Sequence, residues 1–224
     1  ALVFGLIMWS VIFHRKSRGV EAAKWHESLT VEVLWTVVPF IILIVLAFPA
    51  TKTLIKMEDT TTDVDLTIKA TGYQWMWSYD YIDYGVNFYS KLAEESNKIR
   101  QVKSGMDPYE NPNYLYDVDK EVVVPVGKKV RLLTTAADVI HSWWVPELGG
   151  KKDAIPGFIN EMWFTAKEEG VYRGSCAELC GKDHAFMPIV VRVVSQKEFE
   201  QWVTEQGGTL PEVESEEVVA QASH

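Results

Sequence analysis

The sequence feature that most restricts the fold is a predominantly apolar segment from about Leu29 to Ala50. A transmembrane helix needs about 20 consecutive apolar residues, so this segment is long enough to cross a bilayer. Pro39 lies inside it and is expected to kink the helix, which neighbouring helices can accommodate. The alternative is a buried helical hairpin of a soluble protein. The length of the segment and the charges that flank it favour the membrane.

A second apolar run occupies residues 1–13 and is too short to span a bilayer alone. We expect it to be a truncated transmembrane helix, because a signal peptide would end at small residues. Basic residues at 14–18 follow this run, whereas acidic residues at 58–65 follow the longer one. By the positive-inside rule, residues 1–55 form a hairpin with a cytoplasmic turn, and the chain from residue 56 lies on the outer face.

Beyond the apolar segments, the pattern changes to short stretches of alternating or β-branched residues separated by Gly and Pro, and such stretches predict strands. The expected strands are residues 64–69, 72–81, 121–126, 129–135, 140–145, 161–166, 170–175 and 188–194. Almost no helical pattern lies between them. Residues 56–207 are therefore expected to form one all-β domain, either a sandwich or a barrel.

Three parts of this region are not strand-like. Residues 85–120 are polar and rich in turn dipeptides, so we expect a long surface excursion. Ser195 and Glu198 have the spacing of a capping box, and the apolar residues after them predict one short helix packed on the strands. Residues 208–224 contain several acids and little to bury, which predicts a mobile acidic tail.

The charge of the chain limits its partners. The formal net charge is −9, and nearly all of the acidic excess lies beyond residue 50. A nucleic-acid partner is excluded on this ground, because phosphate binding needs a basic surface. An acidic outer domain instead favours a basic protein partner through long-range attraction.

The candidate chemistry is concentrated between Cys176 and Met187. Both cysteines of the chain, Cys176 and Cys180, lie there together with His184 and Met187, within twelve consecutive residues. Thiolate, imidazole and thioether ligands suit copper rather than magnesium or calcium. His141, on a separate expected strand in a Trp-rich segment, could close the site from the side.

Several kinds of site are compatible with this set. Structural zinc leaves no role for a thioether, and a mononuclear blue-copper site uses one Cys, two His and a weak Met. Two thiolates, two imidazoles and a thioether suit two copper ions bridged by sulfur, with Met187 and a backbone carbonyl in the weak positions. Two alternatives stay open: a Cys176–Cys180 disulfide beside a core Met and a surface His, and His141 as a half-buried histidine with ordinary hydrogen bonds.

One acid, Glu32, lies near the start of the long apolar segment. A carboxylate at a helix N-terminus is favoured by the helix dipole, so Glu32 fits an interfacial position. Acids within membranes are also often functional, so it fits a proton-uptake group equally well. The residue pattern does not decide between these two roles.

Together these features resemble subunit II of cytochrome c oxidase. The resemblance covers nearly the whole chain: the apolar hairpin, the aromatic stretch 72–79 that contains Trp75, the segments 138–146 and 153–157, and the Cys–His–Met loop through Met187. It implies a cupredoxin-like Greek-key β-sandwich on a two-helix transmembrane anchor, which agrees with the strands expected above.

The resemblance also implies a binuclear copper centre, CuA. The residues that match its ligands are His141, Cys176, Cys180, His184 and Met187, with the backbone carbonyl of Glu178. The Glu178 carboxylate matches a residue that faces a magnesium ion shared with subunit I of the oxidase.

Three other residues match functional positions of the family. Trp75 matches the aromatic residue through which electrons arrive from cytochrome c, Asp138 an acid tied to docking and copper tuning, and Glu32 an acid near the mouth of a proton pathway into subunit I. The chain departs from many relatives at Phe158, where an Arg that contacts haem propionates of subunit I is common. It departs again at Ser175, where Gln is common.

By this resemblance the chain is expected to be the oxidase subunit that receives electrons, a component of an oxidoreductase and proton translocase. CuA would take single electrons from cytochrome c and pass them to a haem in subunit I, where dioxygen is reduced to water with proton pumping. Subunit III is a further expected partner. The expected location is the bacterial plasma membrane, multi-pass, with the β-domain on the periplasmic side; the mitochondrial inner membrane is the alternative.

Three rival functions remain, and copper content together with electron paramagnetic resonance would separate most of them. A quinol-oxidising relative would keep the fold but lack the copper ligands, and a nitrous oxide reductase domain would lack the hairpin. A purely structural anchor with a disulfide would bind no metal.

Overall fold

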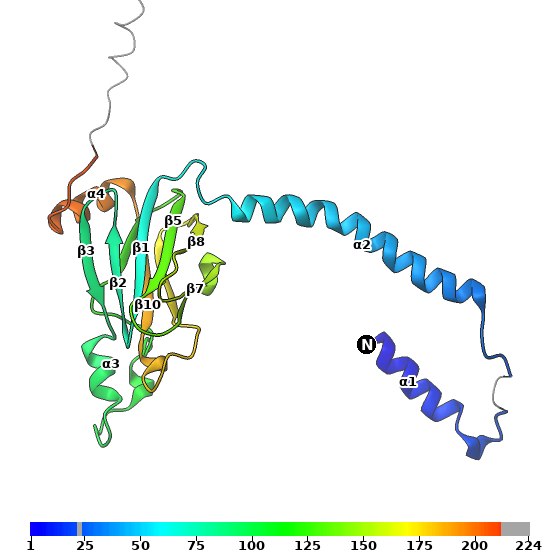
Figure 1. Ribbon diagram of the computed structural model, residues 1–224. Coiled ribbons are helices and arrows are strands. Elements are labelled where there is room, and N and C mark those ends of the chain that lie inside the picture. Colours follow the sequence, from blue (N-terminus) through cyan, green and yellow to red (C-terminus); the bar gives the residue numbers. More distant parts are fainter. Residues whose placement is uncertain (22–23, 212–224) are drawn as a thin grey trace, which may run out of the picture. The chain divides into compact units, whose positions relative to one another are not determined.

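The computed structural model describes residues 1–21 and 24–211 of the 224-residue chain (Figure 1). The chain divides into two compact units, Ala1–Thr53 and a second that begins at Leu54. Of the acidic tail expected at 208–224, residues 212–224 lie outside the described residues.

Two apolar helices open the chain. α1 covers Leu2–Phe13, and α2 covers Leu29–Glu58 with Pro39 and Pro49 inside it. At 1.5 Å per residue, the 30 residues of α2 extend about 45 Å, more than the roughly 30 Å of a hydrocarbon core. No residue of either helix is buried, so their apolar surface is free to face lipid or other subunits.

The expected two-helix hairpin is present only in part. Within the described ranges, α2 alone is long and apolar enough to cross a membrane, and α1 is a shorter apolar helix. The sequence pattern ends the long span near Ala50, whereas α2 continues to Glu58. The extension has a simple cause, because residues 51–58 contain no Gly or Pro and several good helix formers.

The strands form a β-sandwich, as predicted. Its larger sheet has the order β3-β2-β1-β5-β8, the second sheet has the order β4-β10-β9, and β6 pairs with β7 in a two-stranded ribbon. The bounds are β1 Leu66–Tyr73, β2 Met76–Tyr81, β3 Val86–Ser90, β4 Val122–Pro125, β5 Val130–Ala136, β6 His141–Trp144, β7 Lys151–Ala154, β8 Asn160–Phe164, β9 Gly170–Ser175 and β10 Pro188–Val194. Two of the pairings, β1 with β5 and β4 with β10, are parallel.

Side-chain alternation explains where the core lies. β1 and β5 each bury every second residue, as expected for strands with one face toward the core. β10 runs between β4 and β9, and six of its seven residues are buried. The largest fully buried side chains include Trp77, Trp143 and Tyr79, which fill the space between the sheets.

The structure corrects one expected strand. The pattern predicts a single strand over 72–81, but Gly72 and Tyr73 end β1, and β2 begins at Met76. Gln74 and Trp75 form the turn of this hairpin instead. The aromatic run does not reveal the turn, because Tyr and Trp also favour strands.

The excursion 85–120 is more ordered than its polar composition predicts. It begins with β3, which extends the larger sheet, and it contains the helix α3 over Glu94–Ile99. Ser96 and Ile99 of α3 are buried. The short strand and the short helix carry too few apolar residues for a periodicity to stand out.

The predicted C-terminal helix is present as α4, Gln196–Glu205, at the end of the sandwich opposite α3 (Figure 1). Its N-cap Ser195 accepts a hydrogen bond from the Glu198 backbone N–H, as the capping-box spacing predicts. Phe199 is fully buried, and the Trp202 ring lies 5.0 Å from that of Tyr81.

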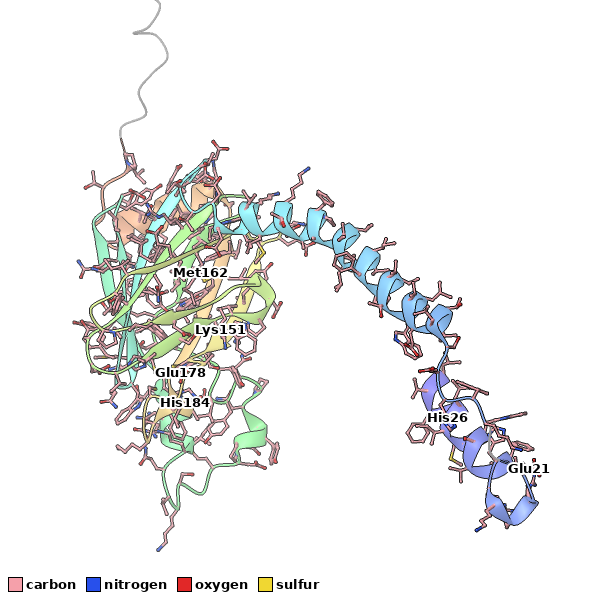
Figure 2. The ribbon with its side chains drawn as sticks, turned by 45° about the vertical axis from the view of Figure 1, so that its right-hand side comes forward. Glu21, His26, Lys151, Met162, Glu178 and His184 are labelled. Carbon is pink, nitrogen blue, oxygen red and sulfur yellow. The ribbon has the colours of Figure 1, made fainter. Side chains whose placement is uncertain are left out.

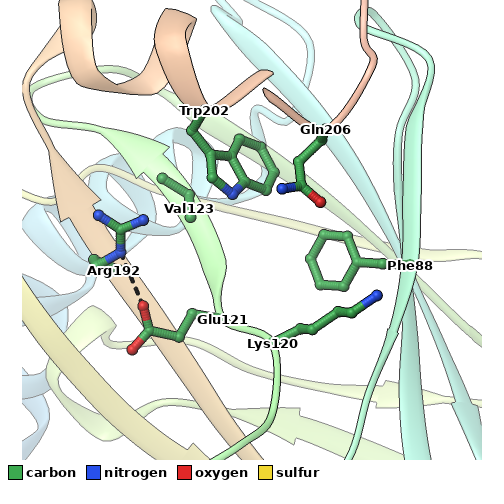
Figure 3. Close-up of a pocket in the computed structure, with 7 residues that line it drawn as sticks. All are labelled: Phe88, Lys120, Glu121, Val123, Arg192, Trp202 and Gln206. Carbon is green, nitrogen blue, oxygen red and sulfur yellow. Dashed lines mark hydrogen bonds and ion pairs between the residues drawn. The ribbon is translucent and has the colours of Figure 1, made fainter. Parts of the chain in front are cut away.

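Trp202 and the Arg192–Glu121 ion pair border a pocket of about 170 Å³ under this helix (Figure 3).

Polar contacts fasten the C-terminal end of α2 and the segment that follows it to the sandwich. The Lys129 ammonium donates to the carbonyls of Asp59 and Thr62, and the Trp163 indole donates to the carbonyl of Met57. Thr60 donates to the Glu161 carboxylate at 2.8 Å. The chain therefore enters the β-domain along β5 and β8.

Candidate metal centre

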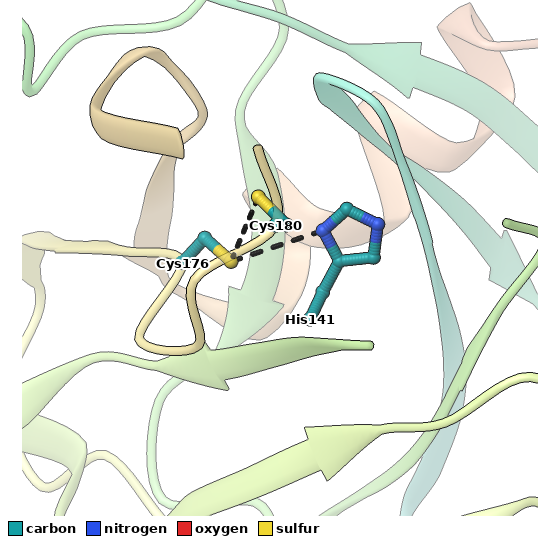
Figure 4. A group of neighbouring side chains, drawn as sticks. All are labelled: His141, Cys176 and Cys180. Carbon is teal, nitrogen blue, oxygen red and sulfur yellow. Dashed lines mark hydrogen bonds between the residues drawn. The ribbon is translucent and has the colours of Figure 1, made fainter. Parts of the chain in front are cut away.

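Three buried side chains from distant parts of the chain converge at one end of the sandwich (Figure 4). The Nδ1 atom of His141 and the Sγ atoms of Cys176 and Cys180 all lie within 4.8 Å of one another. The Cys176 sulfur is 3.9 Å from His141 Nδ1 and 3.9 Å from the Cys180 sulfur. This arrangement leaves the three donor atoms facing a common point.

The other expected donors border the same cluster. The Cys180 sulfur lies 3.5 Å from His184 Nδ1 and 3.5 Å from the Met187 sulfur. The backbone carbonyl oxygen of Glu178 lies 3.4 Å from the Cys176 sulfur, while the Glu178 side chain is exposed (Figure 2). Six donor atoms are thus gathered around the two thiols.

The strands fix both ends of the metal loop, residues 176–187. The loop connects β9 to β10, which are antiparallel partners, and the Cys176 N–H donates to the carbonyl of Met187 at 3.2 Å. The Ala177 N–H donates to the carbonyl of Ser142, which joins the loop to the strand that carries His141.

Gly72 makes room for the imidazole of His141. A Cβ atom at Gly72 would lie 2.6 Å from Cδ2 of His141, closer than such contacts occur.

The two cysteines are free thiols. Their sulfur atoms are 3.9 Å apart, about twice the length of a disulfide bond of roughly 2.05 Å. The disulfide alternative is therefore wrong for this structure. His141 is also not half-buried, as the second alternative expects, but fully buried.

Asp138 orients the His141 ring. Its carboxylate lies 2.9 Å from Nε2 of His141 and also accepts hydrogen bonds from the backbone N–H groups of Gln74 and Val139. With the proton on Nε2, the Nδ1 lone pair is left to point at the thiols. This partner for the outer nitrogen is the usual arrangement for a metal-binding histidine.

The cluster shifts the pKa values of its members. Burial acts to raise the pKa of Cys176, but the contacts that its sulfur and backbone make with His141, Ser142 and Glu178 outweigh burial and lower the pKa. Burial raises the pKa of Cys180 to about 12, and the neighbouring Cys176 charge acts in the same direction. These surroundings therefore favour the thiolate form of Cys176 more than that of Cys180.

Trp75 touches the cluster through the backbone. Its indole Nε1 donates to the carbonyl oxygen of Cys180 at 3.2 Å, and the Gln74 amide donates to the same oxygen at 2.8 Å. Gly181 allows this approach, because a Cβ atom there would lie 3.1 Å from both side chains. Sequence reasoning missed Gln74, whose only signal is its place beside Trp75.

Two residues singled out from the sequence are not among the donors of the cluster. Glu32 is in α2, in the other compact unit, where its carboxylate accepts a hydrogen bond from the Ser28 backbone N–H at 3.3 Å. Phe158 is exposed, with 67% of its surface accessible.

The donor set can be tested against candidate metals. Two thiols, two imidazole Nδ1 atoms and a thioether are soft and borderline ligands, which suit copper and do not suit magnesium or calcium; the carbonyl of Glu178 is the one hard donor in the set. His141, Cys176, Cys180 and Met187 are buried and His184 is half-buried, so most of the donors are shielded from water.

Comparisons with known proteins agree with this chemistry. Residues 66–194 match the family "Cytochrome C oxidase subunit II, periplasmic domain", and residues 1–53 match its transmembrane domain. Cytochrome c oxidase subunit 2 of Arabidopsis thaliana is 40% identical over 210 residues, which cover 92% of this chain and 79% of that protein. A probable cytochrome c oxidase subunit 2 of Rickettsia bellii is 38% identical, covering 97% of this chain and 77% of its own length.

Solved structures extend the likeness to the fold. The crystal structure of the periplasmic domain of subunit II of cytochrome oxidase from Bradyrhizobium japonicum is 48% identical, with a TM-score of 0.56. It covers 64% of this chain and 94% of that domain. A mixed disulfide intermediate between a thioredoxin-like protein and subunit II of cytochrome c oxidase is 46% identical, with a TM-score of 0.53, covering 66% of this chain and 95% of that one.

The family matches include the membrane segment, and the relatives come from both bacteria and plants. The chain therefore belongs to the cytochrome c oxidase subunit II family: it is the membrane-bound oxidase subunit through which electrons enter the complex, with a copper site at its His–Cys cluster.

Proposed function

We propose that the cluster is a CuA centre that holds two copper ions. The proposed ligands are His141, Cys176, Cys180, His184, Met187 and the backbone carbonyl of Glu178. The observation that carries the proposal is the pairing of donors around the thiols. His141 and the Glu178 carbonyl lie beside Cys176, whereas His184 and Met187 lie beside Cys180. One copper ion would leave some of these donors unused.

A bound copper pair would supply one-electron redox chemistry. The protein itself would keep the donor atoms fixed in position and away from water. Both cysteines, His141 and Met187 are buried, and β9 and β10 anchor the two ends of the loop that carries the sulfur donors. Such pre-positioning limits the rearrangement that accompanies a change of charge.

Trp75 is the proposed point of electron arrival. The half-buried indole reaches from the domain surface to the Cys180 carbonyl, which gives a route of one hydrogen bond and a few covalent bonds to the cluster. Asp138 is the proposed tuning residue, because its carboxylate holds the outer nitrogen of His141.

The proposed partners are cytochrome c as donor and subunits I and III of the oxidase, with electrons passing to a haem in subunit I. The acidic charge of the chain supports a basic donor, so turnover with cytochrome c should fall as ionic strength rises. Turnover that does not change with salt would contradict the electrostatic part.

Glu178 supports the proposal of a magnesium ion shared with subunit I. Its carboxylate is exposed and could bind magnesium together with oxygen ligands from subunit I, while its backbone carbonyl faces Cys176.

The proposed topology has both apolar helices in the membrane and the β-domain on its outer face, periplasmic in a bacterium or facing the intermembrane space in a mitochondrion. The basic residues between the two helices support a cytoplasmic or matrix-side turn. Glu32 remains a proposed proton-uptake residue, and its bond to Ser28 supports the interfacial role as well.

The two free thiols also support the proposal that a thioredoxin-like protein reduces these cysteines before copper is inserted. The related domain that was solved as a mixed disulfide intermediate with a thioredoxin-like protein has a cysteine that such a protein reaches. In this chain, an oxidant that takes two electrons and two protons from Cys176 and Cys180, whose sulfurs are 3.9 Å apart, would join them in a disulfide, and a dithiol reductant would have to restore both thiols before copper binds.

Metal analysis of the purified oxidase tests the copper assignment. Cys180→Ser removes one of the two thiols that would hold the copper, and the expected result is that the two copper ions proposed for the wild-type subunit are both absent. Ser104→Ala, in the excursion and outside the cluster, serves as the control. Unchanged copper content in Cys180→Ser would overturn the proposal.

A further inference from the structure

The excursion between β3 and β4 reaches the metal loop through a single arginine. Arg100, at the C-terminal end of α3, places its guanidinium 3.2 Å from the carboxylate of Asp183. The same group lies over the ring of Phe186, 4.3 Å from its centroid. Asp183 directly precedes the proposed ligand His184, and Phe186 directly precedes Met187.

Arg100 is itself held in place. Its Nε donates to the Asn97 side chain at 2.7 Å, so the guanidinium is bound at one edge before it meets the metal loop. Below it, Ser96 is fully buried and accepts a hydrogen bond from the Leu115 backbone N–H, and Ile99 is buried beside it. The arginine therefore projects from a fixed support.

The base of the excursion is closed as well. The Lys91 N–H donates to the Asp119 carboxylate at 2.8 Å, and the Ala93 N–H donates to the carbonyl of Asp117 at 3.0 Å. These contacts join the two ends of the excursion. They therefore restrict the movement of α3 relative to the sandwich.

The segment that Arg100 grips is short. His184–Phe186 is a single 3₁₀ turn, and Asp183 at its N-cap makes no side-chain capping bond. The Asp183 carboxylate contacts Arg100 and the neighbouring Lys182 instead. A turn this short has little stability of its own, so contacts from outside decide its position.

We propose that Arg100 is a positioning residue for His184: by holding Asp183 and Phe186, on the two sides of this ligand, the excursion fixes where the imidazole meets Cys180. The proposal rests on the assignment of His184 as a copper ligand. Arg100, Asp183 and Phe186 also line a surface pocket of about 230 Å³ together with Trp75, so this contact lies beside the proposed point of electron arrival.

The first experiment needs no metal. Hydrogen exchange of the copper-free full chain in detergent should become about tenfold faster at the amides of residues 181–187 in Arg100→Gln, the effect expected when one half-buried ion pair and one cation–π contact are lost together. Asp183→Asn, which breaks the ion pair from the other side, should accelerate the same amides.

Lys98→Ala is the matched control. Lys98 is on the same helix and its removal changes the charge equally, but its partner is the exposed Glu94 rather than the metal loop. Exchange in this variant should match the wild type. Equal exchange rates at residues 181–187 in Arg100→Gln and Lys98→Ala would overturn the proposal.

A second readout reports on the ligand itself. In the copper-loaded oxidase, Arg100→Gln should change the copper hyperfine splitting and the reduction potential, Lys98→Ala should change neither, and Arg100→Lys should restore them in part because it keeps only the charge. Wild-type hyperfine values in Arg100→Gln would contradict the positioning role. Absence of copper from the wild type would instead contradict the proposed function, and the exchange experiment would still decide whether Arg100 holds the loop.

Discussion

The indole nitrogen of Trp75 donates a hydrogen bond of 3.2 Å to the backbone carbonyl of Cys180. One residue thus belongs both to the half-exposed turn between β1 and β2 and to the wall of the metal cluster. The β1–β2 turn thus connects the domain surface to Cys180 through one side chain. Substitutions in this turn therefore test the proposed path of the electron.

Replacing Trp75 by Phe keeps an aromatic ring but removes the donor to Cys180. We expect the rate of reduction by cytochrome c to fall by about tenfold, the effect of a barrier raised by about 1.4 kcal/mol. Stopped-flow reduction of the oxidase measures this rate, and copper content should stay at the wild-type value. An unchanged rate would remove Trp75 from the electron path.

Gly181→Ala should disturb the same contact by crowding it. Gly181 has a φ of +120°, and an added Cβ would lie 3.1 Å from the Trp75 ring and from the Gln74 amide. Strain at such a backbone position costs on the order of 1–3 kcal/mol. We expect a lower thermal midpoint together with slower reduction by cytochrome c.

Gly105→Ala provides the control for backbone strain alone. Gly105 also has a positive φ, +72°, but an added Cβ would meet nothing within 4 Å. It should lower the midpoint without slowing reduction. If both variants slow reduction equally, crowding of Trp75 is not the cause.

The Glu161 carboxylate predicts a pH dependence of stability. Hydrogen bonds from Arg131 and then from Thr60 lower the pKa of Glu161 below its ordinary value of 4.5. A lowered folded-state pKa contributes stability above the unfolded-state pKa, and this contribution is lost as the pH falls through the folded-state pKa.

Glu161→Gln should therefore destabilise the chain at neutral pH, by about 0.5–1 kcal/mol once solvent screening is allowed for. The difference from the wild type should shrink as the pH falls below 4.5. Urea titrations at several pH values measure it, and Glu95→Gln, at an exposed position of α3, is the control. A difference that stays constant down to acidic pH would contradict this account of Glu161.

Phe199 tests the packing of α4. Its ring is fully buried and lies 5.2 Å from the ring of Tyr84. Phe199→Ala should cost about 3–5 kcal/mol of unfolding free energy, as is typical for a large core side chain. Because α4 lies at the end of the sandwich opposite α3, the folded fraction should bind copper as the wild type does (Figure 1). Copper loss from folded protein would show that the two ends are coupled.

Local spacing predicted much of this molecule, because it depends on neighbours in the chain. Three features can be recognised from short stretches of sequence. They are the capping box at Ser195, the long apolar span that begins at Leu29 and the cluster of donors from Cys176 to Met187. The residue pattern marked His141 only as one of five histidines in a Trp-rich stretch, and the family resemblance of segment 138–146 was needed to identify it as a ligand.

Contacts between distant segments could not be predicted in the same way. The parallel pairings of β1 with β5 and of β4 with β10 leave no local periodicity. Arg100 lies 83 residues before Asp183, in a polar stretch that resembles an ordinary loop. Gln74 and Gly72 matter because of what the fold places beside them, Cys180 and His141 respectively.

Electron paramagnetic resonance of the oxidised subunit, combined with its copper content, tests the central claim most directly. The account predicts two copper ions per chain and a hyperfine pattern in which one unpaired electron is shared by both nuclei, because the two thiols and the paired donors around them serve both ions. A single copper ion per chain, with the unpaired electron confined to one nucleus, would contradict it.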